Sequence, residues 1–272
     1  MKRAMLALLI WASCEVHAAF EHLGRGSSVI AMGGASVAAA LDAWAAFSNP
    51  AILPALDERV LSLYYSPQPF GLKELAHGSF SFVEPTSIGA FAVSGSRFGF
   101  ELYRELDFQI SYGGTLSDLL SGGVNLHYYH LSIELYGSAG TIGVDIGLLA
   151  HVSDQLRWGF TAFNVNAPTI GIAKEKLPQV FVTGLSYSPI PEATIAADIE
   201  KDIRYPAELH VGIEYTLMEL LDLRAGTTSD PSTLSAGLGI HYSIVQLDYA
   251  FTDHTELGAT HQVSLSVYLG GL

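Results

Sequence analysis

Acidic side chains occur singly in segments where apolar and polar residues alternate. Five of them fall on the polar side of this alternation, namely Asp107, Asp145, Glu208, Glu214 and Asp248. Carboxylates spaced in this way could line a path for cations. More commonly, such residues hydrogen-bond across a wet interior and hold the shape of its wall. We favour this second interpretation.

Histidines on the same polar side give no sign of a catalytic or metal site. His127, His210 and His241 fall in separate segments, without the short spacing of metal-binding histidine pairs. No spacing suggests a Ser–His–acid triad either, although triads depend on geometry rather than on sequence order. We therefore predict that the chain is not an enzyme and has no metal or cofactor.

One further carboxylate, Asp42, lies in an alanine-rich stretch near the N-terminus. A charge enclosed by a protein favours a partner, and Arg157 and Arg224 fall on the polar side of their segments. One hypothesis is an ion pair between Asp42 and one of these arginines. The alternative is a hydrated carboxylate inside a lumen.

The segments that carry these residues repeat with a period of two. Leu106, Phe108 and Ile110, for example, alternate with Asp107 and Gln109. This period predicts strands with one apolar face. We place them near 59–65, 76–83, 87–98, 105–116, 121–131, 141–152, 156–166, 179–187, 193–201, 207–217, 221–228, 233–243, 245–252 and 260–269.

The composition favours a membrane barrel over a soluble protein. Hydrophobic residues make up 49% of the 272 residues and charged residues only 15%, whereas a soluble domain carries about 25% charged residues. After the first twenty residues, no apolar run reaches the length of about 20 that a membrane helix needs. Strands that alternate lipid-facing and lumen-facing residues produce this combination. A soluble β-sandwich is the alternative, but its outward face would be rich in Lys, Glu and Thr. The formal net charge of -14 argues against nucleic acid as a partner.

The predicted connections alternate in length. Those after odd-numbered strands are longer, at 66–75, 132–140 and 167–178, and those after even-numbered strands are short, at 84–86, 153–155, 218–220 and Ile244. Bacterial outer-membrane barrels have an even number of strands, short periplasmic turns and longer outer loops. The chain is therefore predicted to be all-β, a transmembrane antiparallel β-barrel of about 14 strands with both ends on the periplasmic side.

The N-terminal residues predict two segments before the barrel at 57–272. Lys2 and Arg3, a short apolar run and Val16-His17-Ala18 are typical of a secretory signal peptide, which would end at residue 18. Its Cys14 is the only cysteine, so no disulfide is expected. Residues 19–56 predict a small plug, helical over Ala31–Phe47, with a second helix that starts at Asn49-Pro50.

Short motifs at both ends of the chain resemble a known family. Gly33-Gly34-Ala35, Asp42 and Asn49-Pro50-Ala51 resemble the N-terminal segment of long-chain fatty acid transporter (FadL-type) barrels and their PorV/PorQ relatives. The C-terminal third resembles the PorV/PorQ branch, through Gly212-Ile213-Glu214-Tyr215, Leu223-Arg224-Ala225-Gly226, Ser235-Ala236-Gly237 and Asp248-Tyr249-Ala250-Phe251. The resemblance implies a fourteen-stranded outer-membrane barrel whose N-terminal segment folds into the lumen.

Three functions are compatible with this resemblance. FadL-type barrels pass hydrophobic molecules, and PorV-type barrels serve a secretion system. We expect passive transport of hydrophobic or small solutes or a secretion-associated role, with outer-membrane lipid and either hydrophobic small molecules or secretion-system proteins as partners. A structural barrel with a closed lumen is the third possibility. The residues of interest are the plug motif and the lumen-facing candidates Asp107, Asp145, Arg157, Glu214, Arg224 and Asp248.

Overall fold

The computed structural model describes residues 19–20, 26–40 and 42–270. The predicted signal peptide and Cys14 lie outside these residues. Among the residues described, no helix has the length and apolar character needed to cross a membrane.

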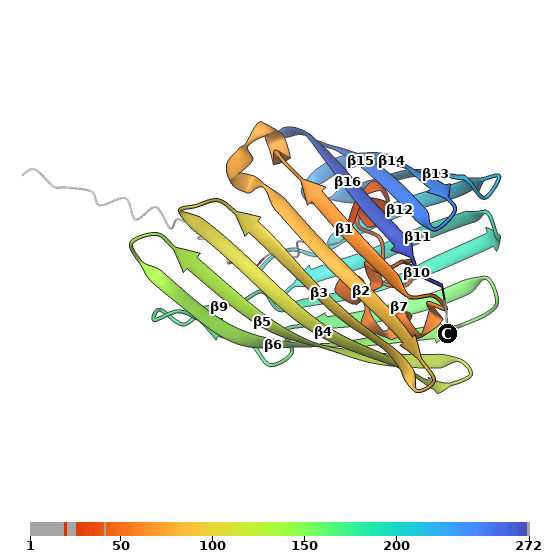
Figure 1. The fold of residues 1–272 in the computed structure, drawn as a ribbon, viewed down its shortest axis with the longest axis horizontal. Coiled ribbons are helices and arrows are strands. Elements are labelled where there is room, and N and C mark those ends of the chain that lie inside the picture. The colour runs from red at the N-terminus through yellow and green to blue at the C-terminus, as the bar shows by residue number, and fades with distance from the viewer. Residues whose placement is uncertain (1–18, 21–25, 41, 271–272) are drawn as a thin grey trace, which may run out of the picture.

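Fourteen strands form one closed antiparallel barrel (Figure 1). Each strand pairs with its neighbours in the sequence, and β1 closes the barrel against β16, with Val60 opposite Tyr268. The barrel strands are β1 (Val60–Ser66), β2 (His77–Thr86), β3 (Gly89–Gly99), β4 (Tyr103–Ser117), β5 (Leu120–Ile133), β6 (Gly137–His151), β7 (Leu156–Phe163), β10 (Val180–Ile190), β11 (Ala193–Asp202), β12 (Glu208–Leu217), β13 (Leu221–Ser229), β14 (Ser232–Tyr242), β15 (Val245–His254) and β16 (Gly258–Tyr268). The predicted all-β fold and strand number are confirmed.

The two ends of the barrel differ in their connections. The longest connections lie at one end, after β1 and after β7. The first contains the 3-10 turns η2 (Pro69–Gly71) and η3 (Lys73–Leu75), and the second contains a small hairpin of β8 (Thr169–Ile170) and β9 (Glu175–Lys176). We call this end the loop end. The opposite end, where β1 begins and β16 ends, has only short connections, and we call it the turn end.

Two of the predicted connections are wrong. The long loop expected at 132–140 is a turn of three residues, 134–136, because β5 and β6 continue to pair as far as Ile133 and Gly137. The turn expected at 84–86 is part of β2, and the chain reverses at residues 87–88 instead.

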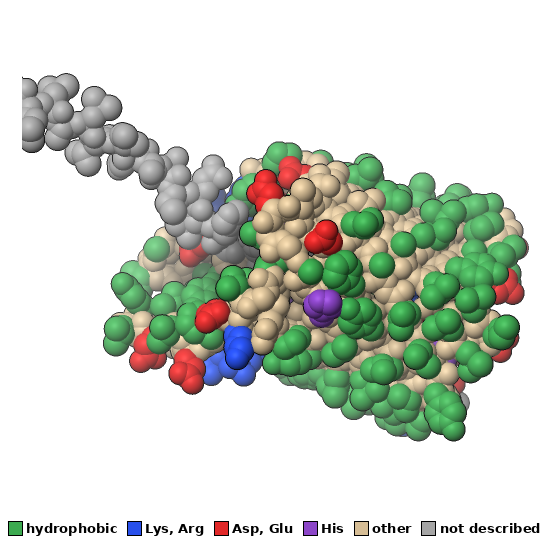
Figure 2. Space-filling view, turned by 90° about the horizontal axis from the view of Figure 1, so that it is seen from above, with side chains coloured by type: hydrophobic (Ala, Val, Ile, Leu, Met, Phe, Trp, Pro, Cys, Tyr) green, Lys and Arg blue, Asp and Glu red, His purple; other side chains and the backbone are tan. Residues whose placement is uncertain are grey.

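The wall of the barrel has an apolar outer face and a polar inner face. On the outside, Leu63 is 49% exposed and Leu126 is 51% exposed, whereas the inward-facing Ser62, Gln109 and Asn125 are fully buried. Hydrophobic side chains are spread over the barrel surface shown in Figure 2. This arrangement is the reverse of that in a soluble protein, and it suits a wall that faces lipid outside and a polar interior inside.

The N-terminal segment lies inside the barrel and is less helical than predicted. It contains α1 (Gly26–Ala31), α2 (Ala45–Ser48) and the 3-10 helix η1 (Pro50–Ala55), joined by turns. The single long helix expected over Ala31–Phe47 is therefore wrong. The alanines serve close packing instead, since Ala31, Ala38, Ala43 and Ala46 are all fully buried. We call residues 26–55 the plug.

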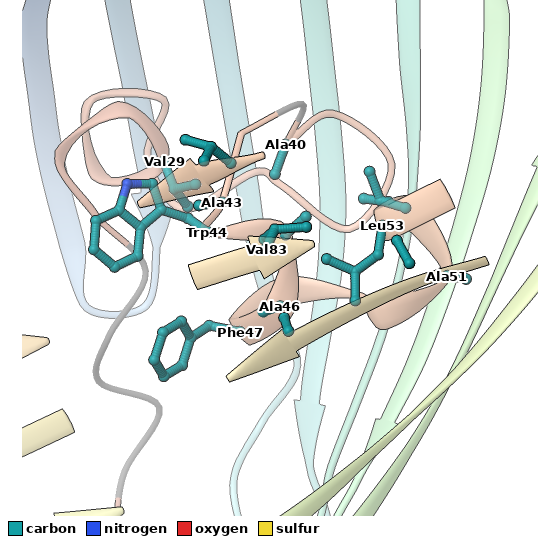
Figure 3. Close-up of a cluster of buried hydrophobic side chains, with 14 of the residues drawn as sticks. Val29, Ala40, Ala43, Trp44, Ala46, Phe47, Ala51, Leu53 and Val83 are labelled. Atoms are coloured by element: carbon teal, nitrogen blue, oxygen red, sulfur yellow. The ribbon is translucent and has the colours of Figure 1, made fainter. Parts of the chain in front are cut away.

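The largest apolar cluster of the described chain lies within the plug and against the wall around it (Figure 3). Trp44, Ile52 and Leu53 are fully buried at its centre. Val83 from β2 and Leu149 from β6 pack against it from the wall. The turn-end half of the lumen is therefore filled by packed side chains.

Candidate functional site

Glycines on the inner face of the wall form the seat of the plug. A Cβ atom at Gly123 would lie 2.4 Å from the Pro50 backbone, and one at Gly159 would lie 2.2 Å from the carbonyl oxygen of Val37. The same holds for the other members of this group, which are Gly113, Gly147, Gly212, Gly226 and Gly237. Because any side chain at these positions would collide with the plug, the glycines allow its backbone to lie directly on the wall.

Asn49 holds three backbone groups together at the centre of the plug. Its Nδ2 donates to the carbonyl oxygen of Val37 at 2.8 Å and to that of Leu148 in β6 at 3.0 Å. Its Oδ1 accepts from the backbone N–H of Ala51 at 3.0 Å, which is the N-cap of η1. Pro50 follows as the first residue of the helix, where its missing N–H costs nothing. Asn49 thus caps η1, as predicted, and also ties the plug to the wall.

Polar wall side chains satisfy other carbonyl groups of the plug. Gln109 and Asn125 both donate to the carbonyl oxygen of Ala46, at 2.6 and 3.1 Å. Ser81 donates to the carbonyl oxygen of Ala43 at 2.8 Å. Buried backbone groups need such partners. These bonds therefore fix the position of α2 relative to β2, β4 and β5.

The Gly33-Gly34-Ala35 motif forms a tight turn that rests on β12 and β13. Gly33 has a φ of +66°, and a Cβ on it would lie 2.6 Å from the backbone nitrogen of Thr227. Both the backbone conformation and the contact therefore require glycine. His210 Nδ1 donates to the Gly33 carbonyl oxygen at 2.7 Å. Ala35 is buried beyond the turn.

The turn that follows is bound by a wall carboxylate. Asp198 in β11 accepts hydrogen bonds from the backbone N–H groups of Ser36 at 2.6 Å and of Val37 at 2.9 Å. Two N–H donors on one carboxylate oxygen form a charge-assisted contact, stronger than a neutral one. The sequence analysis did not identify Asp198. The only indication of it in the sequence was its place on the polar, inward-facing side of the alternation in β11.

Asp42 does not pair with either arginine, so the ion-pair hypothesis is wrong. Its carboxylate accepts from Ser28 Oγ at 2.6 Å and from the backbone N–H of Trp44 at 2.9 Å, both within the plug. Burial raises the pKa of Asp42 from its ordinary value of 3.8 to about 6. The residue belongs to the plug, outside the membrane-spanning strands.

Arg224 is already saturated by carboxylates of the wall, which explains why it leaves Asp42 unpaired. Its guanidinium donates to Asp222 and Asp248, each at 2.6 Å, and also to Glu214. Arg157 instead donates to Ser186 Oγ at 3.4 Å. Arg224 and its three carboxylates thus brace β12, β13 and β15 beside the plug.

A second charged cluster lies on β4, β5 and β6. The His127 ring bridges Asp107, 3.0 Å from Nδ1, and Asp145, 2.6 Å from Nε2. Asp145 also accepts from Asn125, the side chain that binds the plug at Ala46. Asp107, Asp145, Glu214 and Asp248 therefore take part in hydrogen bonds between strands on the inner face. No group of three potential metal ligands occurs in the described part of the chain.

An apolar cluster occupies the mouth of the lumen at the loop end. Phe20 packs on Tyr129 with ring centroids 4.8 Å apart, and Ile170 and Leu177 of the β8–β9 segment complete the buried group. Leu131 and Ala139 pack against it from the wall. The backbone N–H of Phe20 is bound by Glu105 at 2.8 Å. This cluster could not be predicted from the sequence, because Phe20, Ile170 and Leu177 come from irregular segments far apart in the chain.

The fold and this site define a fourteen-stranded barrel closed by an N-terminal plug. No protein-family model matches the chain, and no curated protein matches it either.

Several solved structures share the fold. The P. putida toluene transporter TodX superposes with a TM-score of 0.69 and 14% identity, over 93% of this chain and 100% of that chain. The CymD monoaromatic hydrocarbon channel gives a TM-score of 0.68 and 14% identity, over 93% and 99%. A Pseudomonas aeruginosa FadL homologue gives 0.64 and 12%, over 89% and 97%. The chain thus has the architecture of FadL-type barrels.

Proposed function

We propose that the chain is an outer-membrane channel that admits hydrophobic small molecules, with the plug as its gate. The loop end faces the exterior and the turn end faces the periplasm. The apolar outer face supports a position in lipid, and the longer connections at one end support this orientation. Export by a signal peptide at 1–18 stays a prediction.

The apolar cluster at the loop-end mouth carries the proposal. The inner wall is otherwise lined largely by Ser, Thr, Asn, Gln and charged residues, so an apolar site at the entrance is unexpected for a channel that selects ions or sugars. Ile170 and Leu177 sit on the longest connection of the barrel, where a ligand could displace them without breaking the strand ladder. Two structural neighbours are a toluene transporter and a monoaromatic hydrocarbon channel.

Passage through such a barrel would be passive and would need the plug to move. An apolar solute would first replace the apolar contacts of Phe20 at the mouth. It would then meet the plug, which is held by individual hydrogen bonds from Asn49, Asp198 and wall side chains rather than by covalent links. Each neutral bond contributes about 0.5–1.5 kcal/mol net and each bond to the Asp198 carboxylate about 1.5–3 kcal/mol, so a shift that breaks only a few of them is within reach of thermal motion.

Membership of the PorV/PorQ branch stays a prediction, and so does a role with secretion-system proteins. The C-terminal motifs that suggested it coincide with residues that seat or brace the plug. Gly212, Gly226 and Gly237 contact it directly, while Glu214, Arg224 and Asp248 form the adjacent ion pairs. Plug docking therefore accounts for the inward-facing residues of these motifs. A closed structural barrel is the remaining alternative, favoured by the dense packing around Trp44.

The test is uptake of a labelled monoaromatic hydrocarbon by intact cells that produce the chain. Leu177→Asn places an amide in the mouth cluster and is expected to lower uptake several-fold. Ile172→Asn is the matched control, because Ile172 lies in the same segment but is fully exposed. Uptake at the level of cells without the chain would contradict the proposal and favour the structural barrel.

A further inference from the structure

The lipid-facing wall has a groove where two glycines interrupt its cover of large side chains. Gly78 in β2 and Gly95 in β3 lie in adjacent strands, between Phe80, Phe108 and Tyr128, which are each more than a third exposed. The groove has a volume of about 700 Å³ and is lined almost entirely by apolar atoms. This volume is within the range of ligand sites, about 300–1,000 Å³.

Basic side chains border the groove on the side of the loop end. Arg97 and His130 are among its lining residues, and both are paired across the ladder with Leu106. Arg104 precedes Leu106 by two residues on β4, so its side chain points to the same side of the strand. Figure 2 shows basic side chains at one end of the visible face, with acidic side chains beside them.

The two arginine side chains make no hydrogen bond or ion pair with the described residues. The His130 ring stacks on Tyr128, with ring centroids 6.4 Å apart. The outward-facing positions in the loop-end halves of β2–β5 carry no carboxylate. Asp107 lines the groove too, but its carboxylate faces inward to His127. Charged residues on a lipid-facing wall cost about 2–4 kcal/mol at mid-membrane and almost nothing at the interface. Arg97 and Arg104 lie within two residues of their strand ends, at the level of lipid headgroups.

From this arrangement we infer a binding site for a phosphorylated lipid of the outer leaflet. An acyl chain lies in the groove over Gly78 and Gly95, and the phosphate contacts Arg97 and Arg104. Arginine suits this role because its planar guanidinium binds phosphate in a bidentate manner and stays charged. The site faces the bilayer and is separate from the lumen. It rests on the proposed function only for the orientation of the barrel.

The test is binding of purified full chain to bis-phosphorylated lipid A in detergent, with dephosphorylated lipid A and phosphatidylethanolamine as comparisons. Native mass spectrometry counts the bound lipid. We expect the double variant R97Q/R104Q to bind bis-phosphorylated lipid A about tenfold more weakly, since each basic residue near a lipid surface contributes measurably. Lys201→Gln is the matched control, because Lys201 is also an outward base at the loop end, on β11 away from the groove.

A second variant tests the groove itself. A Cβ at Gly78 would have no neighbour closer than 3.6 Å, so Gly78→Leu fits the fold and fills the groove. It is expected to displace the acyl chain and weaken binding as well. Equal binding by the wild type and R97Q/R104Q, or equal binding of phosphorylated and dephosphorylated lipid, would overturn the inference. So would a Gly78→Leu variant that loses hydrocarbon uptake but retains lipid, because the groove would then serve the solute. If the wild-type chain itself fails to take up hydrocarbon but binds the phosphorylated lipid, only the proposed function is contradicted.

Discussion

Replacing Asn49 by alanine is predicted to release the plug without unfolding the barrel. The Asn49 side chain is fully buried and makes three hydrogen bonds to backbone groups, at 2.8, 3.0 and 3.0 Å. Asn49→Ala leaves these backbone groups without their partner, and each loss costs about 1–3 kcal/mol. A total of about 3 kcal/mol raises the undocked fraction of the plug by about a hundredfold. The strand ladder is untouched, since none of its bonds uses this side chain.

Hydrogen–deuterium exchange of the reconstituted barrel measures this effect, because local opening sets the exchange rate of protected amides. The amides of Asn49 and Ile52, which bond to Ala45 and Asn49 within the plug, are expected to exchange about a hundredfold faster in the variant. Amides of β10–β16 are expected to keep their rates.

Asn166→Ala is the matched control. Asn166 also bonds to two backbone groups, at Val144 and Ile142, but it lies exposed in a loop outside the plug. Unchanged plug exchange in Asn49→Ala, or equal acceleration in both variants, would refute the argument that buried bonds of Asn49 hold the plug.

Three further predictions follow from other parts of the site. Gly226→Ala places a Cβ 2.2 Å from the backbone of Gly33 and is expected to displace the plug and raise ion conductance in planar bilayers. Gly78→Ala, whose Cβ would lie no closer than 3.6 Å to a neighbour, should leave conductance unchanged. Arg224→Gln leaves a buried cluster of carboxylates without its cation, a change that costs about 3–5 kcal/mol. The folded barrel of this variant should therefore lose resistance to heating in SDS. Arg157→Gln, which removes one hydrogen bond, should have little effect. Because burial raises the pKa of Asp42 to about 6, its protonated form favours the docked plug, so docking weakens as pH rises from about 4 to 6 and is constant above. Asp42→Asn should make the protection factors of the plug amides, which are the exchange rates relative to the intrinsic rate at each pH, independent of pH over this window. Persistence of the pH dependence in the variant would exclude Asp42 as its cause.

The strands could be predicted from the sequence because alternation reports directly on two unlike environments. Each predicted segment overlaps a barrel strand, and most errors are of a few residues at the ends. The larger error at 132–140 has a physical cause. Gly137 and Leu135 adopt positive φ values and close a tight turn, so the flanking residues remain in the ladder. Their composition did not distinguish strand from loop.

The plug contacts could be predicted only in part. Asn49-Pro50 signals a helix start by local rules, and η1 follows it. The wall glycines give no such signal, because a small residue on a polar strand face is compatible with water as well as with a docked backbone. The partners of Arg224 could not be predicted, because they depend on which strands are neighbours and on the register between them. The same holds for Asp198, whose plug partners lie 161 and 162 residues away.

The mouth cluster was beyond sequence analysis for a related reason. Phe20, Ile170 and Leu177 lie outside the barrel strands, where periodicity carries no information. Only the closed barrel brings them to Tyr129. The groove at Gly78 and Gly95 likewise depends on two adjacent strands and cannot be read from either one.

Closure of the lumen by the plug is tested most directly by the ion conductance of residues 19–272 in a planar bilayer, compared with the same barrel lacking 19–56. We expect a closed barrel for the longer chain and steady conductance for the shorter one, because the plug fills the turn-end half of the lumen around Trp44 and Leu53. Equal conductance of the two inserted barrels would contradict the claim that the plug closes this lumen.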